Sequence, residues 1–136
     1  MANTVYIGPA ECHPDVSELL ASEAITPGSV LVQSSGEFAL AGAAEAGLVY
    51  FALENILGEV SDAYAIGDTV QGARPKSGEY YELTLAASQT IAKDAALKTN
   101  ASGHLVAQGG TGAIVAYADE AVTTSGSVGK IRVYVK

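Results

Sequence analysis

Two segments of the chain alternate apolar and polar side chains with a period of two residues, and this pattern constrains the fold most. Residues 80–86 read YYELTLA and residues 130–136 read KIRVYVK. Successive side chains on a β-strand point to opposite faces, so both segments are predicted to be half-buried strands. The fifteen glycines of the chain supply tight turns between short strands. The chain is therefore predicted to be mainly β.

A weak internal repeat predicts that the β structure is built in two related lobes. The stretch TPGSVLVQSSGEFAL (Thr26–Leu40) resembles AKDAALKTNASGHLV (Ala92–Val106), and Ile25 aligns with Ile91 at an offset of 66 residues. We expect each stretch to form one hairpin. A later alignment, at an offset of 65, matches residues 47–56 to residues 112–121 and predicts a strand in both, although the alanines before residue 47 favour a helix.

The N-terminal region differs from the rest and is predicted separately. Residues 1–14 contain one short apolar run and two prolines, which indicate an extended N-terminal arm. Asp15 with Glu18 three residues later resembles a helix capping box, so a short helix is predicted near residues 15–23. Residues 15–136 are predicted to form a single compact domain of the β-sandwich or β-tulip type, and a chain of 136 residues is long enough for one core.

Charge and cysteine content exclude several classes of partner. The formal net charge of −8 repels phosphate backbones and anionic lipid heads, so neither a nucleic acid nor a membrane is expected as a partner. The single cysteine, Cys12, cannot form an internal disulfide. We expect the protein to be made in a reducing cytoplasm, and either used there or assembled into a larger structure.

The residues that most often carry chemistry do not form a convincing site. Cys12 and His13 are adjacent and would point to opposite faces of a strand, and His104 follows a glycine turn as a solvated or interface residue. Residues 108–113, QGGTGA, are predicted to be a flexible hairpin connection, because a strand and not a helix follows them. Asp119 and Glu120 could bind calcium but are more typical of a solvated turn. We therefore predict no catalytic residue, no cofactor, no metal and no enzymatic activity.

Several segments of the chain resemble the small capsid decoration (cement, or head-stabilisation) proteins of tailed bacteriophages. The segments are a Gly-Asp-Thr-Val step (Gly67–Val70), SQTIAKDAALKTNASGHLV (Ser88–Val106), AIVAYADEA (Ala113–Ala121) and a glycine-rich turn into the last strand (Gly126–Val135). The resemblance covers roughly residues 24–135. It departs at Asp94, where a glycine is expected, and it does not extend to residues 1–24.

The resemblance implies a structural protein of the virion. A decoration protein of this kind is β-rich, forms a homotrimer and binds the major capsid protein at local three-fold positions on the outer surface of the expanded shell. It stabilises that shell against internal DNA pressure, and weak contacts add through multivalency. An N-terminal strand containing Thr4, Val5, Tyr6 and Ile7 could add to the sheet edge of a neighbour, so these four residues are the predicted capsid-binding residues.

Two other classes of function remain open from the sequence. A surface-displayed β module that binds a carbohydrate or a receptor would need a concave aromatic site, for which the seven tyrosines are the available residues. A small hydrolase would have to use His104 with a distant acid.

Overall fold

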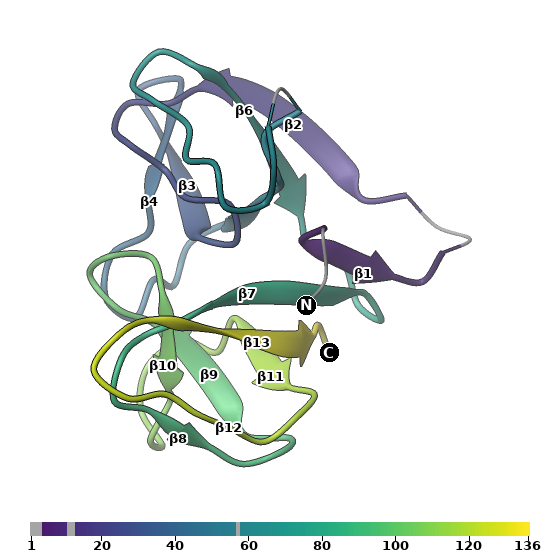
Figure 1. The fold of residues 1–136 in the computed structure, drawn as a ribbon, viewed down its shortest axis with the longest axis vertical. Coiled ribbons are helices and arrows are strands. Elements are labelled where there is room, and N and C mark those ends of the chain that lie inside the picture. The colour runs from purple at the N-terminus through teal and green to yellow at the C-terminus, as the bar shows by residue number, and fades with distance from the viewer. Residues whose placement is uncertain (1–3, 11–12, 57) are drawn as a thin grey trace.

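The computed structural model describes residues 4–10, 13–56 and 58–136, and these residues form an all-β fold (Figure 1). The prediction of a mainly β chain is confirmed. The strands are β1 (Tyr6–Gly8), β2 (Asp15–Leu20), β3 (Val30–Ser34), β4 (Glu37–Leu40), β5 (Tyr50–Ala52), β6 (Thr69–Arg74), β7 (Tyr80–Leu85), β8 (Thr90–Ile91), β9 (Ala96–Thr99), β10 (Leu105–Ala107), β11 (Ala116–Ala118), β12 (Val122–Thr123) and β13 (Gly129–Tyr134).

The second half of the chain, which we call lobe 2 (residues 80–134), closes into a small barrel. Strand β7 pairs antiparallel with β13 along one edge and parallel with β10 at the end of the other edge. Strands β10, β9, β11 and β13 then pair in that order, all antiparallel, and complete the circle. A closed sheet leaves few unpaired edges, which favours a stable small domain.

The first half, lobe 1 (residues 15–74), repeats the same topology. Strands β2, β6, β5, β3 and β4 pair antiparallel in that order. A parallel bridge between Ala21 and Phe38 then connects the end of β2 to β4, and the Ser22 N–H donates to the Phe38 carbonyl at 2.9 Å. In Figure 1 lobe 1 lies above lobe 2, with β7 crossing at the boundary.

The hydrogen bonds confirm that the sequence repeat is a structural repeat. Leu31 pairs with Tyr50 just as Leu97 pairs with Ala116, both at an offset of 66 residues. The predicted offset of 65 for this strand is therefore wrong by one residue. The two predicted hairpins are confirmed as β3–β4 and β9–β10. The turn of the second hairpin holds one extra residue, because Leu97 pairs with Ala107 where Leu31 pairs with Leu40. In this longer turn the Asn100 side chain accepts from the N–H groups of Ser102 and His104.

The predicted helix near residues 15–23 is wrong, because residues 15–20 form β2. All six residues of β2 pair with β6, from Asp15 with Arg74 to Leu20 with Thr69. The capping-box pattern is a local signal worth only about 1 kcal/mol, and a six-residue ladder of backbone hydrogen bonds outweighs it. The side chains of β2 alternate between exposed and partly buried, as expected of a strand with one solvent face.

Two other predictions need correction. Only Tyr50–Ala52 of the predicted strand at residues 47–56 is β structure. Residues 108–113 do form a glycine turn with positive φ at Gly109, Gly110 and Gly112, but the turn is not a hairpin. It connects β10 to β11, which lie on opposite sides of β9, so the connection crosses the end of that strand.

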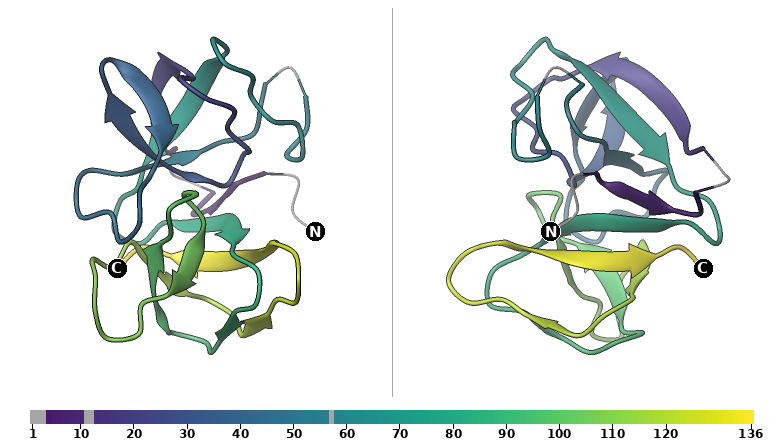
Figure 2. Two further views of the ribbon diagram at one scale, coloured as in Figure 1. Left: turned by 90° about the vertical axis from the view of Figure 1, so that its left-hand side faces the viewer. Right: turned by 45° about the vertical axis from the view of Figure 1, so that its right-hand side comes forward.

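Two apolar clusters fill the fold: one lies inside lobe 1, and the other fills lobe 2 and reaches into lobe 1. Inside lobe 1, Phe38 packs edge-on against Tyr50, with 5.2 Å between ring centroids. The larger cluster fills lobe 2 and extends across the boundary to Phe51 of lobe 1, whose ring lies 4.8 Å from that of Tyr81. The two lobes therefore share buried surface and form one compact unit (Figure 2).

Candidate interaction surfaces

The predicted capsid-binding residues Thr4, Val5, Tyr6 and Ile7 lie along the edge of lobe 2. Tyr6 pairs with Tyr81 of β7, and the Glu82 N–H donates to the Val5 carbonyl at 2.7 Å. Val5 is completely buried, whereas Thr4 and Ile7 are exposed. Only Thr4 and Ile7 of this segment therefore offer substantial side-chain surface to a partner, and deleting the segment would also remove Val5 from the core.

His13, Asp119 and Glu120, candidate residues from the sequence, do not form a catalytic group with one another. Cys12 lies outside the described residues, and His13 is exposed. Asp119 accepts a hydrogen bond from Arg132 Nε at 2.7 Å, and this bond holds the pKa of the Asp119 carboxyl below its usual value. Glu120 accepts from the Arg132 N–H at 2.9 Å. The acidic pair thus binds an arginine within the chain.

His104 lines a pocket at the boundary between the lobes. The pocket has a volume of about 500 Å³, and its walls include Val60 of lobe 1 and Val128 of lobe 2. Lys130 also lines it and donates from Nζ to the Pro27 carbonyl and to Thr84 Oγ1, both at 3.1 Å. Burial lowers the pKa of the Lys130 ammonium. Burial is also the main cause that lowers the pKa of His104, and the nearby charge of Lys130 lowers it further.

This pocket does not assemble the groups that hydrolysis needs. The charge of Glu82 offsets only part of the lowering of the Lys130 pKa, and no carboxylate of the described residues lies within ion-pair distance of Lys130. A hydrolytic His104 would require an acid or a nucleophile hydrogen-bonded to its ring, and no such bond is present among the described residues. Lys130 instead links the lobes, because Pro27 belongs to lobe 1 and Thr84 to lobe 2.

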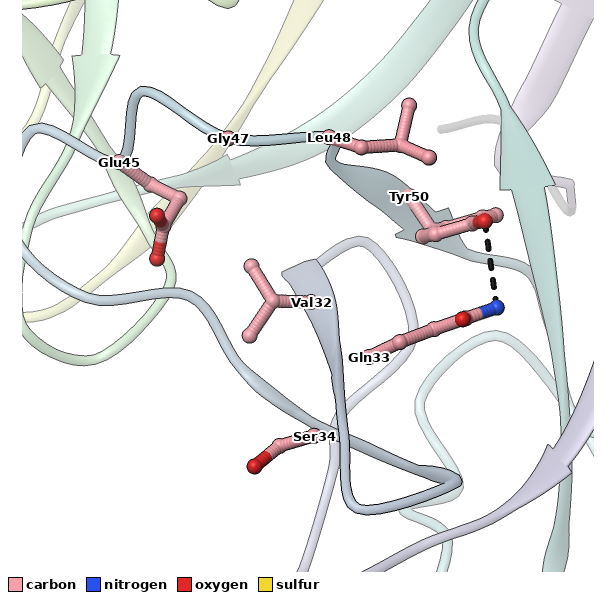
Figure 3. Close-up of a pocket in the computed structure, with 7 residues that line it drawn as sticks. All are labelled: Val32, Gln33, Ser34, Glu45, Gly47, Leu48 and Tyr50. Carbon is pink, nitrogen blue, oxygen red and sulfur yellow. Dashed lines mark hydrogen bonds between the residues drawn. The ribbon is translucent and has the colours of Figure 1, made fainter.

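A second pocket, of about 410 Å³, lies on lobe 1 beside the β3–β4 hairpin (Figure 3). Its lining includes Val32, Glu45 and Leu48, and Gln33 Nε2 donates to the Tyr50 hydroxyl at 3.2 Å across one end. Leu48 is 56% exposed, so the pocket is an open depression with one apolar side chain at its rim. It contains one acid and no base, an arrangement without an evident catalytic use.

Three of the seven tyrosines gather on the outer face of lobe 2. The rings of Tyr117 and Tyr134 are stacked at 5.7 Å, and Tyr80 lies 6.2 Å from Tyr134. The Tyr134 hydroxyl donates to Asp94 at 2.8 Å, and the Lys136 ammonium lies 5.2 Å from the Tyr117 ring centroid. Tyrosine is enriched at protein interfaces because it combines apolar area with a polar tip. We call Tyr80, Tyr117 and Tyr134 the tyrosine face.

In residues 4–10, 13–56 and 58–136, no three histidine, cysteine or acidic side chains are grouped so that they could hold a metal ion. The same residues contain no helix long and apolar enough to cross a membrane.

Sequence reasoning missed the boundary pocket and the tyrosine face. Lys130 and the Pro27 carbonyl are 103 residues apart, so no local spacing signals their contact. Part of the tyrosine face could have been predicted from the sequence, since Tyr80 and Tyr134 both lie on the polar side of the two alternating segments. A cross-strand pairing of those segments would have placed the two rings together.

Comparison with known proteins identifies the fold. No family model matches the chain, and no curated protein matches it. Among solved structures, the N base of the head fiber gp8.5 in bacteriophage phi29 is similar, with a TM-score of 0.64 and 15% sequence identity. The match covers 91% of this chain and 95% of the phi29 chain. The likeness therefore spans both lobes, and at this identity it establishes a shared fold.

Proposed function

We propose that the chain is a structural protein of a bacteriophage virion, which binds the outer surface of the expanded capsid. The observation that carries this proposal is the match over 91% of the chain to the base of a phage head fiber. The resemblance of residues 24–135 to capsid decoration proteins is independent support, because it rests on sequence features. In this role three copies surround each local three-fold position and bridge subunits of the major capsid protein.

The composition of the surface suits such a mechanical role. Nine large apolar side chains among the described residues are at least 38% exposed, and they include Ile56, Ile66 and Val128. Each isolated contact of this kind is weak, but a trimer that touches several capsid subunits at once gains avidity. The role requires no catalytic residue.

The direct test is co-sedimentation of the purified protein with expanded, undecorated capsids of the source phage. We expect saturable binding with a fixed ratio of copies to capsid subunits. Unexpanded capsids serve as the control and should bind less, because the proposed binding site belongs to the expanded shell. Protein that stays in the supernatant with both kinds of capsid would contradict the proposal.

The predicted capsid-binding residues can be tested without disturbing the core. Ile7 is 39% exposed, so Ile7→Asp should weaken capsid binding if this segment faces the shell. Leu48→Asp, a matched change at an exposed leucine of lobe 1, is the control. Equal capsid binding by both variants and the unmodified protein would show that the N-terminal segment does not contact the capsid. That result would not contradict the proposed role in the virion.

A further inference from the structure

Part of the contact between the two lobes joins a turn and an aromatic ring of lobe 1 to the β7 edge of lobe 2. On the lobe 2 side, β7 presents an outward backbone N–H at Thr84, and on the lobe 1 side the Gly28 carbonyl accepts it at 3.0 Å. Beside this bond, the Phe51 ring of lobe 1 packs against Tyr81. A turn carbonyl and an aromatic ring of one lobe thus cover the strand edge of the other.

Lobe 2 carries the counterparts of both covering groups, and neither is buried as its lobe 1 equivalent is. Asp94 occupies the position of Gly28: φ is +67° and +90° respectively, and their N–H groups donate to the equivalent carbonyls of Ala118 and Ala52. Gly28 is buried, whereas Asp94 is exposed. Tyr117 pairs with Tyr134 as Phe51 pairs with Ala73, so Tyr117 of the tyrosine face is the counterpart of buried Phe51.

Lobe 1 in turn carries the counterpart of the covered edge. Leu20 is the equivalent of Thr84, one residue before the position where each lobe closes by a parallel pairing. The Ala21 N–H points toward β6 and bonds the Asp68 carbonyl at 2.9 Å, so by strand alternation the Leu20 N–H points to the opposite edge. That N–H has no partner among the described residues, and the Leu20 side chain is 47% exposed.

We propose that two copies of the chain associate head to tail, lobe 2 of one copy covering the β2 edge of lobe 1 of the next. The Asp94 carbonyl of one copy accepts from the Leu20 N–H of the other, and Tyr117 packs beside it as Phe51 packs within the chain. The occupant of the open edge is a second copy because lobe 2 already has the conformation that fills the equivalent edge internally.

This contact is heterologous, and repeating it produces a closed ring when the rotation between copies allows closure. The proposed contact adds detail to the proposed function, and the expectation of three copies in the ring comes from that function. The contact itself requires no capsid. Its failure is therefore distinguishable from failure of the virion role, which is tested with capsids.

The test is the mass of the full chain in solution, measured by sedimentation velocity over a range of concentrations. We expect the unmodified protein to form a discrete oligomer. Leu20→Pro removes the outward N–H and leaves the inward hydrogen bonds of β2 in place, because proline is tolerated on an edge strand where its nitrogen faces solvent. Leu20→Pro and Tyr117→Ala should each raise the dissociation constant roughly tenfold or more. Leu48→Ala, at an exposed apolar site outside the contact, should leave it unchanged.

A gain of association provides the complementary result. The double substitution Lys93→Pro with Asp94→Gly copies the Pro27–Gly28 turn of lobe 1 into lobe 2 and should tighten the oligomer. Circular dichroism of each variant reports folding, and if Leu20→Pro fails to fold, Tyr117→Ala and the copied turn decide. A monomer at all concentrations for both the unmodified protein and the copied-turn variant would overturn the proposal. An oligomer that Tyr117→Ala leaves intact would overturn it as well.

Discussion

The two lobes share one topology but fill it with different side chains. Phe38 of lobe 1 and Leu105 of lobe 2 occupy the equivalent place on β4 and β10, each paired to the end of the first strand of its lobe. Across the barrel, lobe 1 has Gly72 where lobe 2 has Val133, as their pairing to Ala52 and Ala118 shows. The large Phe38 ring therefore packs opposite glycine in lobe 1, and the smaller Leu105 side chain lies opposite valine in lobe 2. Strand pairing determines the barrel in both lobes, while the total side-chain volume of the interior is balanced within each lobe.

The most disruptive way to break this balance is Gly72→Val. A Cβ at residue 72 would lie 2.6 Å from Phe38 Cζ, so the ring must move or the strands must separate. We expect the free energy of unfolding, measured in urea, to fall by about 3 kcal/mol. Adding Phe38→Leu, which copies the lobe 2 pair, should restore part of the loss. Strict additivity of the two substitutions would contradict the volume argument.

Gly36 and Gly103 occupy the turns of the two hairpins and differ in their contact with the other lobe. Both have positive φ, but a Cβ on Gly36 meets nothing within 4 Å, whereas a Cβ on Gly103 would lie 2.7 Å from the Val30 carbonyl oxygen. Gly103→Ala should therefore cost about 2–3 kcal/mol, and Gly36→Ala about 1 kcal/mol. Equal losses for the two variants in thermal or urea unfolding would show that Gly103 is not packed against lobe 1 as described.

High pH should unfold the protein through its buried tyrosines. Burial is the main cause that raises the pKa of Tyr64 in lobe 1 to about 12, and burial also raises the pKa of Tyr81 at the boundary. A raised pKa stabilises the folded state below the usual tyrosine pKa of about 10, and this stability is lost as the pH rises through the folded value. We expect a loss of roughly 1–3 kcal/mol between about pH 10 and 12 for the Tyr64 group.

The check is urea unfolding at several alkaline pH values, with tyrosine ionisation followed by ultraviolet absorbance. Tyr64→Phe should flatten the alkaline loss, although it should lower stability at neutral pH because the Leu53 carbonyl loses the donor that lies at 2.8 Å. Tyr80→Phe, on the tyrosine face, is the control and should leave the alkaline profile unchanged. An identical profile for Tyr64→Phe would argue against ionisation of this residue as a cause.

The smallest effect is expected at the ion pair of lobe 2 that lobe 1 lacks. Asp119 bonds Arg132, whereas the equivalent residues of lobe 1 are Leu53 and Gln71, joined by the same backbone hydrogen bond. The lowered pKa of Asp119 adds stability above the usual aspartate pKa, and that stability is lost as the pH falls through the folded value. Asp119→Asn should therefore change the neutral midpoint only slightly and remove this acid dependence. A large change at neutral pH would show a structural role beyond the ion pair.

The sequence predicted what depends on local pattern and missed what depends on distant partners. The alternation at residues 80–86 and 130–136 predicts two strands, which are confirmed as β7 and β13, and the repeat predicts the two hairpins. The resemblance expects a glycine at residue 94, and the positive φ of Asp94 explains why. A helix is predicted at residues 15–20 because Asp15 and Glu18 are local signals, whereas the partners of these residues in β6 lie 49 to 59 residues away along the chain. The boundary pocket and the open β2 edge likewise exist only once the lobes are folded together.

Decoration of the outside of a phage capsid by this chain can be seen directly by cryo-electron microscopy of expanded capsids mixed with the protein. We expect added density for three copies around each local three-fold position, with lobe 2 of each copy against β2 of the next. Capsids without added density at saturating protein would contradict it.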